Sequence, residues 1–247
     1  GYNKFKMIKF KFFSKLISII YIFFYLISTK FAICKDNFKK DFQYIEAELN
    51  QRNFVKLEKY FDKNQKIDFK NKFLTLVKEF PDAKWEIIKS KSINANQHKL
   101  NLKLSGSKNL NGQKFKLESN FNFIFNLDNG LIKKSNIKNN LTTIRSDDNQ
   151  IDIKISIPDE VLTGSKYDID IILNQPLGET IIAGGIQEYQ EGSLLNQSIR
   201  LEPLASGGIF KVSRAPLIPG IQIWTGMIAH PKGLISFTKS VNIIGDN

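Results

Sequence analysis

The sequence predicts a fold in two parts, an α+β region followed by an all-β sandwich, behind an N-terminal export segment. Three observations lead to this prediction. Apolar residues repeat at helical spacing up to residue 80, alternate at strand spacing over residues 85–144, and alternate again over 151–243 between frequent Pro and Gly residues. A chain of 247 residues is long enough for two domains of modest size. The expected parts are residues 1–34, 35–146 and 147–247.

Residues 1–34 have the pattern of a secretory signal peptide. Lys9, Lys11 and Lys15 precede the apolar run from Leu16 to Ser28, and small residues follow at Ala32 and Cys34. A membrane-spanning helix needs about 20 apolar residues, so this run suits a signal peptide better. Three outcomes stay open: cleavage after Cys34, acylation of Cys34 as in a lipoprotein, or retention as an N-terminal anchor that contacts the membrane. In each case we expect export across the cytoplasmic membrane.

Charge divides the chain. Residues 35–146 hold 23 Lys and Arg against 12 Asp and Glu, whereas residues 147–247 hold 7 against 12. A basic region can contact an anionic membrane or another polyanion, but lysines that alternate with asparagines on solvent-exposed faces give the same composition. Export argues against nucleic acid as a partner. Cys34 is the only cysteine, so we expect no disulfide.

Three short helices are expected before residue 82. Asp36 or Asn37 can cap the first helix, Asn53 can cap the second, and Pro81 ends the third. The three apolar stripes are Phe38, Phe42, Ile45 and Leu49; Phe54, Leu57, Tyr60 and Phe61; and Phe69, Phe73, Leu76, Val77 and Phe80.

Strands are expected after the helices. Trp85 and Ile87 alternate with charged residues, and residues 100–104 repeat this pattern. The clearest strand is Phe115 to Phe125, which reverses at Asp128-Asn129-Gly130 into an antiparallel partner over residues 131–144.

Several phrases in this first part resemble the nuclear-transport-factor-2-like superfamily over residues 37–146. These are the three N-terminal helices, Phe80-Pro81-Asp82-Ala83-Lys84-Trp85-Glu86-Ile87, the strand opened by Asn111-Gly112-Gln113, and residues 125–132. The resemblance implies a cone-like α+β domain, in which three helices pack on a curved antiparallel sheet around an apolar pocket. Similar enzymes include ketosteroid isomerase and polyketide cyclases, although many relatives use the cone as a pocket or dimer surface without catalysis.

A ligand pocket in such a cone would be lined by aromatic and polar side chains. The candidates are Tyr44, Tyr60, Trp85, His98, Phe121 and Phe123. Each also has an ordinary interpretation, as a core aromatic or, for His98, as an exposed turn residue. No residue is assigned a catalytic role, and we expect neither a metal nor a cofactor, because the two histidines lie in different halves and no phosphate-binding loop is present.

The second half predicts seven strands over residues 151–157, 167–173, 180–186, 199–204, 209–212, 221–229 and 234–243. This pattern resembles an immunoglobulin-like module of bacterial exported proteins over residues 150–244, although Trp224 has no cysteine pair to pack against. The loops at residues 187–192 and 216–220 can form recognition surfaces.

These expectations favour an exported protein that acts by binding, with an unknown protein partner or a second copy of itself. The alternatives are a small-molecule enzyme or carrier of an apolar ligand in the cone, and attachment to an anionic membrane or polyanion through the basic half.

Overall fold

The protein is described here from a computed structural model, which places residues 38–57, 63–93, 97–128, 131–146, 151–174, 181–189, 198–204, 207–231 and 233–245. The described helices are α2 (Phe38–Asn50), α3 (Phe54–Leu57) and α4 (Lys63–Glu79). The strands of the first half are β1 (Lys84–Ser92), β2 (Gln97–Leu110), β3 (Gln113–Asp128) and β4 (Leu131–Ser146). Those of the second half are β5 (Ile153–Ser156), β6 (Glu160–Leu162), β7 (Lys166–Leu173), β8 (Ala183–Glu188), β9 (Glu202–Pro203), β10 (Gly208–Arg214), β11 (Gly220–His230) and β12 (Gly233–Ile244).

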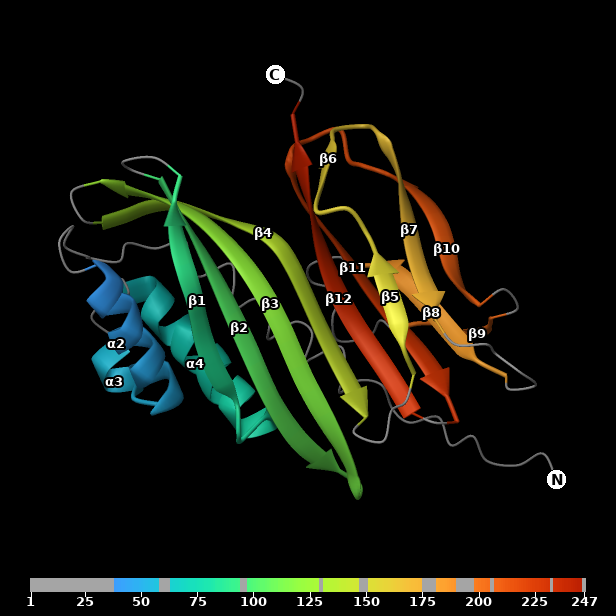
Figure 1. Ribbon diagram of the computed structural model, residues 1–247, viewed down its shortest axis with the longest axis horizontal. Helices are drawn as coiled ribbons and strands as arrows, with labels where there is room; N and C mark the ends of the chain where they lie inside the picture. Colours follow the sequence, from blue (N-terminus) through green and yellow to red (C-terminus); the bar gives the residue numbers. More distant parts are fainter. Residues whose placement is uncertain are drawn as a thin grey trace.

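Most of these strands form one large sheet. Its strand order is β1-β2-β3-β4-β12-β11-β8-β9, with β6 added in parallel to β12, and a second sheet has the order β10-β7-β5. The helices lie against the β1 end of the large sheet, and the small sheet packs beside β11 and β12 (Figure 1). The last strand in sequence therefore lies in the middle of the large sheet.

The expectation of a cone-like domain of the nuclear-transport-factor-2-like superfamily is wrong. The three described helices and the four strands β1–β4 are present, but the outer edge of β4 is not free: Leu141–Arg145 pairs with Ile235–Lys239 of β12. A cone needs a sheet that curls around a pocket of its own. Here the sheet continues instead into the second half of the chain, and the fold is mainly antiparallel β-structure with short helices.

The expectation of a separate immunoglobulin-like module is also wrong. The second half does pack as two layers, as a sandwich does, but only the layer β10-β7-β5 is its own. The other layer consists of β12, β11 and β8, which belong to the sheet shared with the first half. The expected strands over residues 199–204 and 180–186 are observed as the shorter β9 and the shifted β8.

The helices and the small sheet cover opposite faces of the large sheet. A Cβ added to Gly106 of β2 would lie 3.2 Å from Cβ of Phe80, which identifies the helix side of the sheet. Residues that stand opposite each other in a sheet point to the same face, and Gly106, Leu117, Ile144 and Ser236 stand opposite one another in turn from β2 to β12. Ser236 therefore also lies on the helix side. The neighbouring β12 residues Ile235 and Phe237 point to the other face, into the core under the small sheet.

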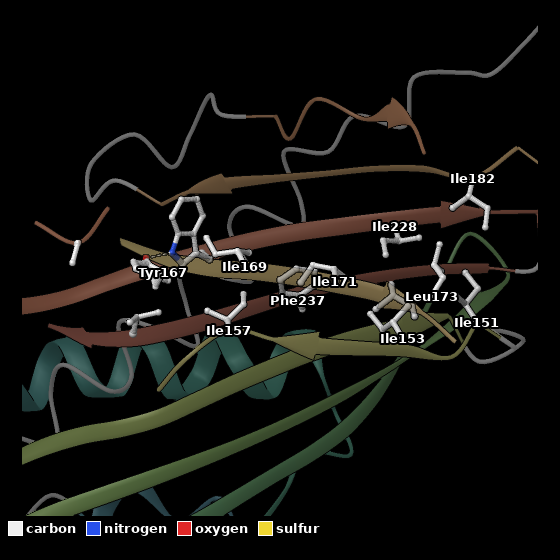
Figure 2. Packing of buried hydrophobic residues seen from close by; sticks show 14 of the residues in the cluster. Ile151, Ile153, Ile157, Tyr167, Ile169, Ile171, Leu173, Ile182, Ile228 and Phe237 are labelled. Carbon is white, nitrogen blue, oxygen red and sulfur yellow. Dashed lines mark hydrogen bonds between the residues drawn. The ribbon is translucent and has the colours of Figure 1, made fainter. Parts of the chain in front are cut away.

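The core between the two layers is apolar apart from one polar network. Tyr167, Ile169, Ile171 and Leu173 of β7 face Ile228 and Phe237 across the layers (Figure 2). Within this core Nε1–H of Trp224 donates to Oη of Tyr167 (2.7 Å), and the Tyr167 hydroxyl donates to Oε1 of Gln222 (2.6 Å). Burial raises the pKa of Tyr167, partly offset by hydrogen bonds from Trp224 and Ser213. The tyrosine thus bridges the two layers.

The junction of β4 and β12 is closed at both ends by serine hydroxyls. The backbone N–H of Asn140 donates to Oγ of Ser240 (3.2 Å), and the N–H of Leu234 donates to Oγ of Ser146 (2.9 Å). These contacts extend the pairing by one position on either side of Leu141–Arg145. The two halves are therefore joined by both backbone pairing and side-chain hydrogen bonds.

Across this junction runs a row of buried hydroxyl groups, which we name the hydroxyl row. Ser119, Thr142, Thr238 and Thr225 pair in turn across β3, β4, β12 and β11, and each is at most 5% exposed. Ser119 and Thr142 hydrogen bond to each other, and Thr142 also donates to Oδ1 of Asn140 (3.4 Å). Among the described residues the Thr225 and Thr238 hydroxyls have no hydrogen-bond partner. The row is thus bonded at one end and unbonded at the other.

Replacement of the unbonded hydroxyls by methyl groups should stabilise the protein. We expect Thr238→Val and Thr225→Val each to raise the free energy of unfolding by about 1 kcal/mol, because a buried hydroxyl without a partner is costly and valine keeps the shape. Urea denaturation measures this change. Thr142→Val is the matched control and should lower stability, since it removes bonded groups. A loss at Thr238→Val as large as at Thr142→Val would show that the Thr238 hydroxyl has a partner.

Removal of the Tyr167 hydroxyl should destabilise the two-layer packing. Tyr167→Phe leaves Nε1 of Trp224 and Oε1 of Gln222 without a partner, which costs about 1–3 kcal/mol per group. Because the pKa of Tyr167 is raised in the folded protein, its contribution is present below the unfolded pKa and is lost as the pH rises through the folded value. Urea denaturation at neutral and at alkaline pH should therefore show a smaller decline with pH in Tyr167→Phe. Equal stability of the two proteins at neutral pH would contradict the bridging role.

Candidate functional site

Among the described strands, β10 is an edge strand with exposed apolar residues, and it lies at one edge of the small sheet. It pairs on one side with β7, from Gly208 opposite Ile172 to Arg214 opposite Lys166. Since β10 is the first strand in the order β10-β7-β5, its second side has no neighbour within that sheet. This side is called the open edge below.

The register shows which residues present backbone groups to the open edge. Leu173 N–H donates to the Gly207 carbonyl (2.8 Å), and these two residues stand opposite each other when the β7–β10 register is continued. In an antiparallel pair, hydrogen-bonded and non-hydrogen-bonded positions alternate. Every second residue after Gly207 therefore bonds to β7, and the intervening Phe210, Val212 and Arg214 direct their N–H and C=O groups to the open edge.

The same residues carry the exposed side chains of the strand. Phe210 is 55% exposed and Val212 is 64% exposed, whereas Gly208 is buried. Cζ of Phe210 lies 3.2 Å from the position that a Cβ on Gly208 would occupy, so the ring lies over this glycine. The accessible part of the open edge therefore extends from Phe210 to Arg214.

The inner face of β10 is fixed to the core. Nζ of Lys211 lies 4.9 Å from the centroid of the Trp224 ring, a cation–π contact. Ser213 forms a side-chain hydrogen bond with Tyr167, which links the strand to the network of Trp224 and Gln222. Two of the inward side chains of β10 are thus held by aromatic residues, which keeps the outer residues in a defined position.

A second exposed apolar group follows directly on β10. In the loop before β11, Leu217 is 82% exposed and Ile218 is 78% exposed. The loop is held at its base, because Arg214 Nη1 donates to the Gly164 carbonyl (2.8 Å) and Gly164 N–H donates to the Pro216 carbonyl (3.0 Å). We name residues 216–219 the apolar tip. This loop is one of the two that the sequence predicts as possible recognition surfaces, and its aliphatic side chains are exposed to solvent.

The described residues among those expected to line a cone pocket lie on four elements, α2, β1, β2 and β3. Trp85 of β1 and Phe121 of β3 are each 1% exposed, and Tyr44 of α2 is half-buried. His98 stands opposite Ser92 and Phe125 in the sheet, and Phe123 stands opposite Leu100 and Ile137. Tyr60 and Cys34 lie outside the described residues.

Register places Trp85 opposite Leu104, which in turn is opposite Ser119, and Phe121 opposite Leu102, so Trp85 and Phe121 lie in adjacent cross-strand rows. Within the described ranges, no cluster of three or more His, Cys, Asp or Glu residues is arranged to hold a metal ion. None of the helices in the described part of the chain has the length and apolar character needed to cross a membrane.

The predicted strand over residues 209–212 is present as β10, but its place at a sheet edge does not follow from the sequence pattern. Alternation of Phe210 and Val212 with Lys211 and Ser213 is usual for a half-buried strand, and the usual assignment would place the apolar residues inside. Here Lys211 points inward over Trp224 and the apolar side chains point outward. The pair Gly207-Gly208 at the start of the strand is a local sign of unusual geometry, with Gly207 at φ +74°.

The comparisons with known proteins bear on this second half. The comparison with curated proteins gave no match. Residues 148–244 match a family model described as a domain of unknown function (DUF8623). The matched range contains every strand from β5 to β12, and thus the open edge of β10, the apolar tip and the Tyr167 network.

Proposed function

We propose that the protein is exported and acts without catalysis, by binding an extended segment of a protein partner along the open edge of β10. The observation that carries this proposal is that Phe210 and Val212 direct backbone groups to an edge that pairs with no other described strand, and that they also carry exposed apolar side chains. Addition of a strand to a sheet edge is a recurrent form of recognition, in which main-chain hydrogen bonds give affinity and alternate side chains give specificity.

Comparison with the other sheet edges supports this choice. The edge strand β1 points Lys84 and Glu86 outward together with Ile88, and charged residues on an edge oppose pairing with other chains. The edge strand β5 has four residues and β9 has two. Among the edges of the described sheets, β10 therefore combines length with an apolar outer face.

Export is proposed from the N-terminal sequence. Lysines before a short apolar run and small residues at Ala32 and Cys34 are typical of a signal peptide. Such a segment would bring the open edge to partners outside the cytoplasm.

Photo-crosslinking tests the binding surface. A photo-reactive amino acid at position 212 of the full chain, activated in the native cell envelope, should give a covalent product with a protein of defined mass. The matched control is position 88, because Ile88 is also an outward aliphatic residue of an edge strand, 42% exposed. We expect at least about a tenfold higher yield at position 212, since of the two edge strands compared β10 has the apolar outer residues and β1 has charged ones. Equal yields at the two positions, or none at 212, would exclude the proposed surface.

The mass of the intact protein purified from its native envelope tests export. Cleavage after Cys34, acylation of Cys34 and an uncut N-terminus each predict a different mass. We expect a product that begins after or at Cys34, because the apolar run is shorter than a spanning helix requires. An uncut chain recovered only from the cytoplasm would contradict export.

A further inference from the structure

We infer that the strand bound at the open edge is β10 of a second copy of the chain, paired antiparallel about a twofold axis through Val212. The inference rests on the proposed function and names its partner. Three properties of β10 support it: the extent of its accessible part, the charges along its edge, and the rows of side chains that continue from β7.

The accessible residues of the edge determine where the twofold axis lies. Phe210 to Arg214 is exposed apart from the half-buried Ser213, whereas Gly208 is buried. A twofold axis through Phe210 would place Val212 opposite the buried Gly208 of the other copy. An axis through Val212 uses only the accessible residues, and it brings the edge-directed backbone groups of Phe210, Val212 and Arg214 opposite one another in hydrogen-bonded pairs.

Charge argues against a pairing centred on Lys211, the residue between Phe210 and Val212. An axis through Lys211 would place this lysine directly opposite its own copy, and like charges at opposed positions destabilise a pair of strands. With the axis at Val212, Lys211 stands opposite Ser213 of the second copy. In the same register Phe210 stands opposite Arg214 of the second copy, where the guanidinium can lie over the aromatic ring.

The rows that continue from β7 are complementary in charge. In the observed register Asp170 stands beside Phe210, and Lys166 stands beside Arg214. Pairing about Val212 produces a row that runs from Asp170 through Phe210 to Arg214 and Lys166 of the second copy. The symmetric row carries the same charges in reverse order. The acidic end of each row thus belongs to one copy and the basic end to the other.

Such an interface leaves no open edge of β10 for a third copy. The two small sheets would join into one six-stranded sheet with the order β5-β7-β10-β10-β7-β5, and both open edges of β10 would be used. A twofold interface of this kind gives a dimer rather than a fibre. The pairing also covers the exposed apolar side chains of Phe210 and Val212, which would otherwise promote uncontrolled association.

A charge exchange at position 212 tests the inference with the full chain. We expect the unaltered protein to sediment as a dimer. Val212→Lys and Val212→Asp should each weaken the dimer by about tenfold or more, because the introduced charge meets its own copy across the axis. An equimolar mixture of the two variants should restore the dimer, since the introduced lysine then faces the introduced aspartate. Ile88→Lys and Ile88→Asp are the controls and should leave the dimer unchanged, alone or mixed.

The outcomes separate this inference from the proposed function. A monomeric unaltered protein, a dimer that persists in both single variants, or a mixture that does not re-associate would overturn the β10 dimer. Restoration in the mixture also shows that both variants are folded, and circular dichroism of each variant checks this independently. If the chain is monomeric but crosslinks at position 212 to a different protein, the binding function stands and the self-pairing fails. If there is neither a dimer nor a crosslink, both fail.

Discussion

Five residues of β4, Leu141 to Arg145, pair with β12 and turn two sets of strands into a single sheet. Without this pairing β4 would leave a long edge beside a buried row of hydroxyl groups, and β12 would lose one of its two long neighbours. The serine hydroxyls of Ser240 and Ser146 accept backbone N–H groups at its two ends, which fixes the register. A slip of one residue would turn Phe237 out of the core and bring Thr238 into it. The position of every strand from β5 to β12 relative to the helices depends on this junction.

The polar groups of the core hold the strands of the two layers in position. Tyr167 joins β7 to Trp224 of β11, and Trp224 in turn lies under Lys211 of β10. The strand with the open edge is thereby tied to both layers through side chains rather than through a second neighbouring strand. This arrangement explains how β10 can keep a defined shape although only one of its sides is paired. A preformed edge loses less conformational entropy when it binds than a flexible segment does.

Sequence patterns predicted the local elements well, because helical and strand periodicity depend on neighbouring residues. The stripe at Phe73, Leu76 and Phe80 and the alternation of Phe115 with Leu117 both lie on the buried faces that were expected. The same sequence patterns could not predict which strands are neighbours in the sheet. The alternation of Ser236, Thr238 and Ser240 with apolar residues is typical of a solvent-exposed face, yet these side chains are at most 5% exposed. Burial of a polar face depends on what packs against it, and the sequence of one strand carries no record of its distant partner. The cone resemblance failed for this reason.

The central place of β12 has a consequence for how the chain folds. This strand, Gly233–Ile244, follows the other described strands in the sequence, yet it lies between β4 and β11 and pairs with residues about 95 positions earlier in the chain. Synthesis from the N-terminus therefore leaves this edge of β4 without its β12 partner until β12 has emerged, and contacts of such sequence separation form slowly. Until β12 has been made, the large sheet lacks one of its central strands. The period before β12 is available is therefore the one in which aggregation competes most strongly with folding.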